Sequence, residues 1–289
     1  LRLFGNIMEA MKKNSIPCSV AVLTFNNEQT IRRCLESVSD FSEIIVCDGG
    51  STDRTLEIAR EYGCVIITQD KKYKYPNNKI ADFSGVRNQT LERAFHKWFA
   101  YVDSDEFFSP EVVSEIREII TSREPRGYVF NVPRKYVRNV VVIDCSANYP
   151  NHQVRFFHRD HVTQFRKKVH EKITLKEGEK YAKLKNHMLI PMDDPIEVIT
   201  EKQRYYVKIQ AKRLKDISVP VWFRWILLYE LNSMTKYFLK YLYSRLFCRG
   251  TRMSFAFEMT RIKYTWWVGV AVTKNLLKRL IGMRGKEHD

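Results

Sequence analysis

The sequence has no apolar stretch long enough to cross a bilayer. Its most apolar segment, VWFRWILLYELNSMTKYFLKYLYSRLF, is interrupted by Arg224, Glu230, Lys236 and Lys240, whereas a spanning helix needs about 18 uninterrupted apolar residues. We see no secretory signal at the start of the sequence. These absences exclude an integral membrane protein of the helical kind, and we expect a soluble or peripheral protein of the cytoplasm.

The cysteines form no CxxC pair and no cluster with histidine at zinc-ligand spacing. Cys18 and Cys47 lie in apolar runs, where a free thiol packs as a small apolar side chain. Thiols are kept reduced in the cytoplasm. We therefore expect six reduced, structural cysteines: Cys18, Cys34, Cys47, Cys64, Cys145 and Cys248.

Internal repeats and low-complexity segments are also absent, and what the sequence has in excess is positive charge. The net charge is +16, and residues 201–289 hold 19 Lys or Arg against 6 Asp or Glu, a net of +13, with 16 aromatic residues. Basic residues interleaved with aromatic ones suit an anionic membrane surface or a nucleic acid. The alternative is a set of helices whose apolar faces pack on the main domain.

The first 120 residues alternate between short apolar runs and helical patterns. Strands are expected at 18–24, 43–48, 64–68 and 98–103, and helices at 26–40, from a cap at Ser51 or Thr52 to Tyr62, at 79–95 and from Pro110. In the helix at 79–95 the apolar positions are Phe83, Val86, Leu91 and Phe95. Apolar strands that alternate with helices indicate a parallel sheet covered on both faces.

The pattern changes after Gly127. Short β segments are expected at 127–132, 140–144 and 153–159, and long helices from Pro195 onward, broken near Val219-Pro220 and Arg249-Gly250. We therefore divide the chain into an N-terminal extension (1–16), an α/β domain (17–194, with halves 17–110 and 111–194) and a basic, aromatic helical region (195–289).

Carboxylates follow three of the expected strands, where ligands of parallel sheets collect. Glu28 follows the first strand, Asp48 and Asp53 follow the second, and Asp103 and Asp105 follow the fourth. Two carboxylates one residue apart can hold Mg²⁺ or Mn²⁺ against a diphosphate, or can belong to a solvated turn. Asp48 can meet a nucleobase or ribose, or form a turn with Gly49-Gly50, and Asp53 can simply favour a helix N-terminus.

Four blocks in register resemble a known family. TFNNEQTIRRCLESV, EIIVCDGGSTDRTLEIAREYG, GVRNQTLERA and YVDSDE are similar to the family-2 glycosyltransferases of GT-A fold. The likeness is close over residues 17 to 110. Later segments, QVRFFHRD, KKVHEKI and KNHMLIPMDDPIEVITEKQRYY, resemble a bacterial subgroup of lipopolysaccharide core and other cell-surface glycan transferases.

The resemblance implies an inverting transferase with a nucleotide-sugar donor, a UDP-sugar being favoured, and a divalent metal, Mg²⁺ or Mn²⁺. It implies the metal at Asp103 and Asp105. The implied donor site comprises Thr24, Phe25, Asn26, Glu28, Asp48, Arg87, Asp103 and Ser104. Many relatives have Tyr-Asn where this chain has Phe25-Asn26. Arg87 would contact the diphosphate, although a solvated helix arginine is the alternative.

An inverting transfer needs a base that takes the proton of the acceptor hydroxyl. Many family members use an Asp of a Glu-Asp pair, where this sequence has His170-Glu171. Glu171 is our candidate base and His170 a phosphate or metal contact. An exposed pair beside neighbouring lysines is the alternative. Asp144 and Asp194 are reserve bases, and His187 is a possible third metal ligand or an ordinary hydrogen-bonded histidine.

We therefore expect a cytoplasmic glycosyltransferase on the inner face of the cell membrane. Its partners would be a nucleotide-sugar donor, a glycan or lipid-linked acceptor and an anionic membrane surface, with no nucleic acid. The alternatives are a nucleotidyltransferase acting on a sugar phosphate, which TFNNEQT disfavours because it has no glycine, and a non-catalytic RNA-binding protein, for which no RNA-binding module is recognisable.

Overall fold

The computed structural model describes residues 15–168 and 171–282, which pack into two compact units. The first holds the described residues up to Lys135 together with Pro150–Pro191, and the second holds Tyr136–Tyr149 and the described residues from Met192 onward. The division at 191/192 lies close to the expected boundary at 194/195. The segment 136–149, in contrast, packs with the helical region.

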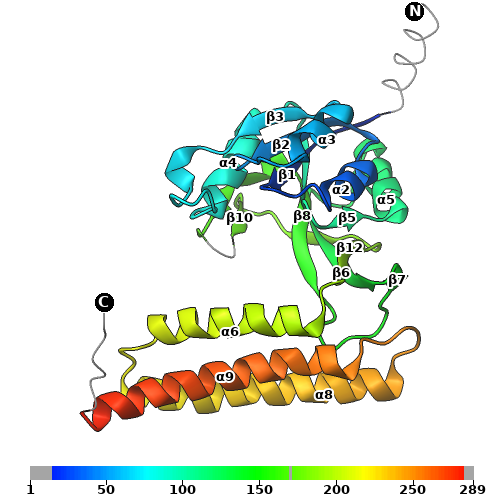
Figure 1. The fold of residues 1–289 in the computed structure, drawn as a ribbon. Coiled ribbons are helices and arrows are strands. Elements are labelled where there is room, and N and C mark those ends of the chain that lie inside the picture. The colour runs from blue at the N-terminus through cyan, green and yellow to red at the C-terminus, as the bar shows by residue number, and fades with distance from the viewer. Residues whose placement is uncertain (1–14, 169–170, 283–289) are drawn as a thin grey trace, which may run out of the picture. The chain divides into compact units, whose positions relative to one another are not determined.

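Parallel strands form the core of the first unit's sheet (Figure 1). They are β1 (Ile16–Thr24), β2 (Phe41–Asp48), β3 (Val65–Thr68) and β4 (Trp98–Asp103). The sheet continues through β8 (His152–His158), β6 (Val129–Arg138), β12 (Met188–Pro191) and β5 (Phe107–Phe108), in the order β3-β2-β1-β4-β8-β6-β12-β5. The pairs β4–β8, β8–β6 and β12–β5 are antiparallel. The expected α/β class with a parallel core is confirmed.

Helices cover both faces of this sheet, because its central strands are apolar on both sides. Val20 and Val22 of β1 belong to a core shared with α2 (Ile31–Ser37), α3 (Thr55–Glu61) and α5 (Pro110–Thr121). Ala21, between them, faces the other way and belongs to a core with α4 (Phe83–Arg93), as the two-residue period of a strand requires.

Smaller elements complete the description. They are η1 (Lys71–Tyr73), β7 (Val141–Val142), η2 (Arg159–His161), β9 (Val162–Arg166), β10 (Lys172–Leu175) and β11 (Tyr181–Lys183). β9 and β10 form a separate antiparallel pair whose apolar residues, including Phe165 and Ile173, join the core on the α4 side.

Three helices begin later than the sequence pattern predicts, and the first of them, expected at 26–40, is α2 at Ile31–Ser37. Asp82 caps α4 by accepting a hydrogen bond from the Gly85 amide at 3.0 Å. The helix ends at Arg93, so Phe95 lies beyond it and is 81% exposed, which makes its expected core position wrong. Likewise α3 begins at Thr55 without a cap from Ser51, whose hydroxyl instead donates to Asp48.

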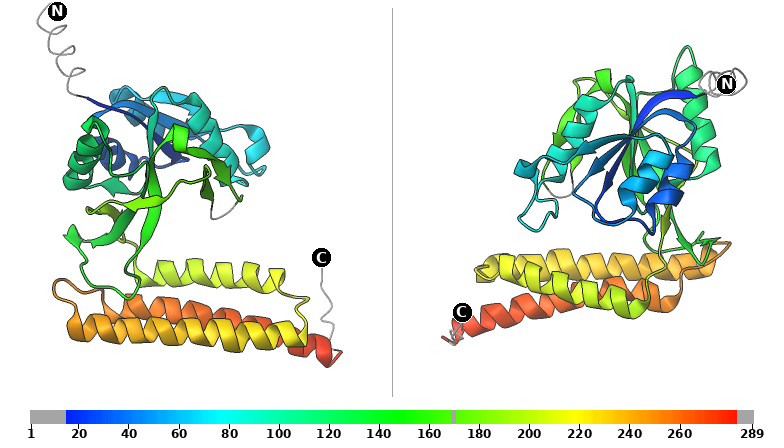
Figure 2. Two further views of the ribbon diagram at one scale, coloured as in Figure 1. Left: turned by 180° about the vertical axis from the view of Figure 1, so that it is seen from behind. Right: turned by 45° about the horizontal axis from the view of Figure 1, so that its top comes forward.

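Long helices form most of the second unit (Figures 1 and 2). They are α6 (Ile196–Arg213), α7 (Val219–Phe223), η3 (Arg224–Leu231), α8 (Asn232–Phe247) and α9 (Phe255–Leu280). α9 packs against α6 and α8. Trp222 Nε1 donates to Thr273 Oγ1 at 3.0 Å, and Pro220 lies in the first turn of α7, where its missing amide costs no helical bond. None of the described helices is long and apolar enough to cross a membrane.

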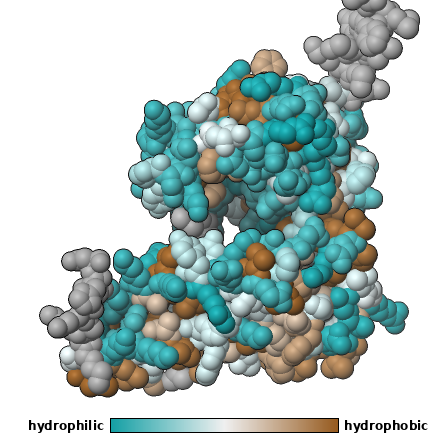
Figure 3. All heavy atoms as spheres, in the orientation of Figure 1, coloured by the Kyte–Doolittle hydropathy of each residue, from teal (hydrophilic) through white to brown (hydrophobic). Residues whose placement is uncertain are grey.

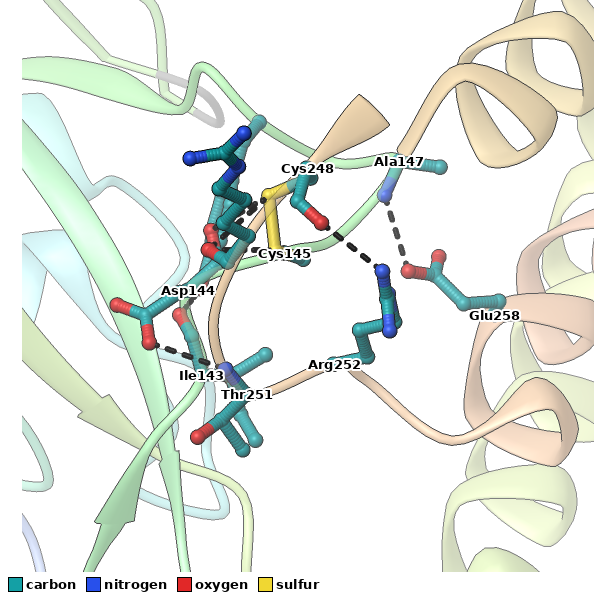
Figure 4. Close-up of a disulfide and its surroundings, with 10 residues drawn as sticks. Ile143, Asp144, Cys145, Ala147, Cys248, Thr251, Arg252 and Glu258 are labelled. Carbon is teal, nitrogen blue, oxygen red and sulfur yellow. Dashed lines mark hydrogen bonds between the residues drawn. A yellow bond between two sulfur atoms is a disulfide. The ribbon is translucent and has the colours of Figure 1, made fainter. Parts of the chain in front are cut away.

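Two of the six cysteines are not reduced, contrary to expectation. Cys145 and Cys248, 103 residues apart, form a disulfide within the second unit (Figure 4). The chain near Cys145 pairs with the chain after α8: Asp144 and Cys145 amides both donate to the Thr251 carbonyl, at 2.8 and 3.0 Å. Buried Glu258 accepts from the Ala147 amide at 2.9 Å. Sequence spacing could not reveal this pair, since only the fold brings it together.

The other four cysteines are free, as expected. Cys18, Cys34 and Cys47 are buried and Cys64 is partly buried. Burial raises the pKa of Cys47 and of Cys64 to about 12, so these thiols stay protonated and unreactive at neutral pH.

We predict that Cys248→Ser lowers the free energy of unfolding of the oxidised protein by about 4 kcal/mol, because the bond closes a loop of about 100 residues. Urea unfolding with and without a reductant measures this. The reductant should lower the midpoint of the wild type and leave the Cys248→Ser midpoint unchanged. A wild-type midpoint insensitive to complete reduction, verified by thiol labelling, would contradict the prediction.

Candidate active site

The strand-end residues singled out in the sequence lie at one edge of the sheet. Thr24 of β1 pairs in register with Asp48 of β2. On the other side of β1, Leu23 pairs with Asp103 of β4. Parallel strands present their carboxyl ends at the same edge, so the loops that follow these three strands are neighbours.

The first loop is tied to the second by its polar side chains. Asn26 has a positive φ of 54°, and its Oδ1 accepts from the Thr52 amide at 2.8 Å. Glu28 Oε2 accepts from the Arg54 amide at 3.0 Å. Asn27, which sequence reasoning did not select, accepts from the Thr24 hydroxyl at 3.0 Å and the Phe25 amide at 2.9 Å. These contacts fix the shape of the loop that the resemblance assigns to the nucleotide.

Asp48 forms the turn that follows its strand. Its Oδ2 accepts from the amides of Gly50 and Ser51, at 2.8 and 2.9 Å, and its Oδ1 accepts from the Ser51 hydroxyl at 2.5 Å. Gly50 has a φ of 98°, which an L side chain rarely adopts. Asp48 is 4% exposed. The turn-forming alternative is thus realised, with both carboxylate oxygens in use.

Asp103 is held between two buried arginines. Its Oδ1 accepts from Arg87 of α4 at 2.7 Å and its Oδ2 accepts from Arg155 of β8 at 2.6 Å. Burial alone would raise the pKa of Asp103, but Arg155 and then Arg87 hold it well below its usual range. Asp103 is therefore ionised, and both of its oxygens are already engaged by guanidinium groups.

The two arginines connect Asp103 to further carboxylates. Arg87 Nε donates to Glu171 Oε1 at 2.6 Å, and Arg155 Nη2 donates to Glu106 Oε2 at 3.0 Å. Arg134 of β6 also pairs with Glu106. The cluster of Arg87, Arg134, Arg155, Asp103, Glu106 and Glu171 thus contains three cations and three anions, and we call it the buried charge cluster.

Asp105 differs from its neighbours in the same turn. Among the described residues it makes no ion pair, and its side chain reaches solvent. Partial burial, followed by the charge of Asp103, raises the pKa of its carboxyl. Ser104, between the two aspartates, is buried. Asp105 is consequently the carboxylate of this turn that remains available to a cation.

A cavity of about 630 Å³ opens beside the buried charge cluster. Arg87, Asp103 and Glu171 line it together with Tyr101 and Tyr181. Arg87 is 4% exposed, and its Nη1 has no partner among the described residues. The guanidinium lies 4.3 Å from the centre of the Tyr101 ring. Arg87 thus brings a guanidinium to the wall of the cavity, and guanidinium groups bind phosphate and carboxylate well.

The remaining candidates have separate positions. Among the described residues no group of three His, Cys, Asp or Glu side chains could hold a metal ion, and a ligand role of His187 stays a prediction. His170 lies outside the described residues. Both reserve bases make structural contacts in the second unit: Asp144 accepts from the Thr251 amide at 3.1 Å and Asp194 pairs with Lys202 at 2.7 Å.

Sequence reasoning missed Arg155, Glu106 and Arg134. Arg155 is 2% exposed and precedes Phe156 and Phe157, both fully buried. A cation inside an apolar strand must be paired if both faces of the strand are covered. The segment QVRFFHR contained this signal, but its partners were not identifiable before the fold was known.

The family is established by comparison with known proteins. The family model described as glycosyl transferase family 2 matches residues 19–175, more than half of the chain, from within β1 to the end of β10. The chain belongs to glycosyl transferase family 2. Most of its α/β sheet lies within the matched part of the chain, and the C-terminal helices are additional to it. The family disfavours the nucleotidyltransferase and RNA-binding alternatives.

Similar proteins match only in part. The SPbeta prophage-derived glycosyltransferase SunS of Bacillus subtilis is 29% identical over 177 residues, which cover 57% of this chain and 37% of that protein. The lipopolysaccharide core biosynthesis glycosyltransferase LpsC of Rhizobium meliloti is 25% identical over 118 residues, 38% of this chain and 42% of that protein. The chain thus spans less than half the length of these relatives.

A solved structure with a likeness to this family-2 chain is glucosyl-3-phosphoglycerate synthase from Mycobacterium tuberculosis, in complex with Mn²⁺, uridine diphosphate and glucosyl-3-phosphoglycerate. It is 21% identical, covers 46% of this chain and 47% of its own, and has a TM-score of 0.31. A likeness at this level says nothing about the substrate of the present protein.

We predict that Arg155→Met lowers the free energy of unfolding by about 3 to 5 kcal/mol, because it leaves the three carboxylates of the buried charge cluster with only two arginines. Urea unfolding measures this. Arg54→Met is the control: its pair with Glu57 is exposed and is worth at most about 1 kcal/mol. Adding Glu106→Gln to Arg155→Met should restore part of the loss. Equal effects of Arg155→Met and Arg54→Met would contradict the prediction.

Proposed function

We propose that this family-2 enzyme transfers a sugar, with inversion, from a nucleotide-diphosphate donor to a saccharide or lipid-linked acceptor. A UDP-sugar is the favoured donor. The observation that carries the proposal is the guanidinium of buried Arg87, which lines a cavity at the strand-end edge of the sheet. A diphosphate is a ligand that such a guanidinium binds well. The strand ends at Thr24 and Asp48 lie along the same edge, which is where nucleotides bind in such sheets.

The loop around Asp48 is the proposed nucleotide site, together with Thr24, Phe25, Asn26 and Glu28. A Cβ on Gly49 would lie 3.1 Å from Phe25 Cβ, so this turn places backbone close to the Phe25 loop. Asp48 holds its own turn and Asn26 ties the two loops together. We propose that they shape the pocket and that backbone groups of the loops complete the contacts to the base and ribose.

The turn at 103–105 fits a divalent cation through Asp105. Asp105 has no ion-pair partner among the described residues, whereas both oxygens of Asp103 are engaged by Arg87 and Arg155. We therefore propose that Asp105 holds Mg²⁺ or Mn²⁺ and that Asp103 orients the arginines. The bound cation would supply charge stabilisation to the departing nucleoside diphosphate. Ser104 would contact the donor through this turn.

Glu171 is the proposed base. As the acceptor oxygen forms its bond to the anomeric carbon, the bond from that carbon to the phosphate oxygen breaks, and Glu171 takes the proton of the acceptor hydroxyl. Arg87 donates to Glu171 Oε1, which fixes the carboxylate beside the cavity and leaves Oε2 to accept the proton. The same arginine thus orients the base and neutralises the donor.

We further propose that residues 201–289 associate with the inner face of the cell membrane and bring the active site to the acceptor. The net charge of +13 in this region and its 16 aromatic residues support this. Cell-surface glycan synthesis is the proposed setting, and LpsC, by its name, takes part in lipopolysaccharide core biosynthesis.

We predict that Asp105→Asn abolishes metal-dependent turnover, because it removes the charge that holds the cation and keeps the size of the side chain. Hydrolysis of UDP-, GDP-, ADP- and CMP-sugars with Mn²⁺, together with calorimetric titration of the nucleoside diphosphate, measures the loss. Asp160→Asn, at an exposed carboxylate paired with Lys97, should retain wild-type turnover. Near-normal turnover of Asp105→Asn at saturating Mn²⁺ would show that Asp105 is not the metal ligand.

We predict that Glu171→Gln reduces transfer by about two to four orders of magnitude, the range that general-base catalysis supplies. Glutamine can still accept a hydrogen bond from Arg87. The affinity for the donor should therefore stay within about threefold of the wild-type value, because a neutral hydrogen bond merely replaces a charge-assisted one. Steady-state transfer and donor titration separate the two effects, with Glu177→Gln, an exposed glutamate, as the control. A defect confined to donor affinity would remove Glu171 from the role of base.

A further inference from the structure

One face of α8 packs against the rest of the second unit. Tyr237 and Ser244, seven residues apart, are buried, and Met234 and Tyr241 beside them are partly buried. This spacing of three and four residues is that of a single helical stripe. The Tyr237 hydroxyl donates to buried Glu258 of α9, which fixes the rotation of α8 about its own axis.

The opposite face of α8 is apolar and exposed. Leu239 and Leu246 each follow a buried residue by two positions, so they point about 200° away from Tyr237 and Ser244 at 100° per residue. They are 57% and 72% exposed, and Tyr243 beside them is 66% exposed. Soluble proteins normally place polar residues at such positions. Folding of the second unit therefore does not account for these leucines.

The exposed apolar surface continues toward the N-terminal side of α8. Leu228 and Tyr229 of η3 are 65% and 66% exposed, and Val221 and Phe223 of α7 are more than half exposed. Figure 3 shows apolar residues at the surface of the helical unit. Contiguous apolar patches on a protein surface mark sites of interaction with another protein or with a membrane.

The charges beside this surface are of one sign. Asn232–Phe247 contains Lys236, Lys240 and Arg245 and no acidic residue. By helical angle the two lysines flank one side of the leucine face and the arginine flanks the other. Long basic side chains can cover the apolar boundary with their methylene groups while the charged ends reach phosphate.

We infer that the exposed face of α8, defined by Leu239, Leu242, Tyr243 and Leu246 with its flanking Lys236, Lys240 and Arg245, is the surface that enters the headgroup region of an anionic lipid bilayer. The inference rests on the proposed membrane association and specifies its contact face. Two copies of this chain packing through the same face would oppose basic residues to basic residues, which is unfavourable. A nucleic acid would satisfy the charges but not the leucines.

The test uses the 289-residue chain and vesicles of phosphatidylcholine with or without phosphatidylglycerol. The wild type should co-sediment with anionic vesicles and weakly with neutral ones. Leu239→Asn/Leu246→Asn should weaken binding about tenfold or more, since it removes two apolar side chains from the boundary. Leu280→Asn, at an exposed leucine of α9, should bind like the wild type. Far-ultraviolet circular dichroism and donor hydrolysis verify that each variant is folded.

Charge is tested separately. Lys236→Gln/Lys240→Gln/Arg245→Gln should weaken binding at low salt and flatten its salt dependence. The matched set Lys71→Gln/Lys79→Gln/Arg123→Gln, at exposed residues of the first unit, should change neither the binding at low salt nor its salt dependence.

Wild-type binding by the Leu239→Asn/Leu246→Asn variant would overturn the assigned face while membrane association stands. No wild-type binding to anionic vesicles would overturn both. Concentration-dependent dimerisation abolished by the leucine substitutions, without vesicle binding, would assign the face to a second copy.

Discussion

Two buried arginines that share one aspartate hold the active-site edge of this protein together. Arg87 comes from α4, Arg155 from β8 and Asp103 from the end of β4, so the contact joins α4 to the parallel and the antiparallel parts of the sheet. None of the three can be buried alone, since an uncompensated charge in this environment costs several kcal/mol. Their mutual pairing therefore fixes where α4 and β8 stand relative to the strand end.

The proposed function depends on what lies beside this pairing. Three cations and three anions balance within the buried charge cluster, and Arg87 also lines the cavity. Asp105, two residues after Asp103, keeps a carboxylate without an ion pair among the described residues. A site that offers a buried cationic donor on one side and a carboxylate on the other is complementary to a diphosphate that carries a divalent cation.

The sequence predicts the parts of this arrangement that depend on local pattern. Apolar runs that alternate with helical spacing specified the parallel core, and the positions of Asp48 and Asp103 after their strands specified the shared edge. Arg155 could not be assigned in the same way, because its partners are 49 and 52 residues away and only strand pairing brings them together. The disulfide between Cys145 and Cys248 was missed for the same reason. Phe95 was misplaced because the cap at Asp82 and the end at Arg93 shift the helix relative to its apolar pattern.

In the helical unit, the sequence pattern does not predict which face of α8 packs inward, and the reason is not distance in sequence. α8 is apolar on two opposite faces, so its periodicity alone does not identify which face packs inward. The hydrogen bond from Tyr237 to Glu258 and the burial of Ser244 settle that question, and they leave the leucines outside. All the charged residues of α8 are basic. The outward face therefore differs chemically from an apolar surface that would pack into a protein core. At the boundary between headgroups and acyl chains, the leucines of this face can contact acyl chains while its basic side chains contact anionic headgroups.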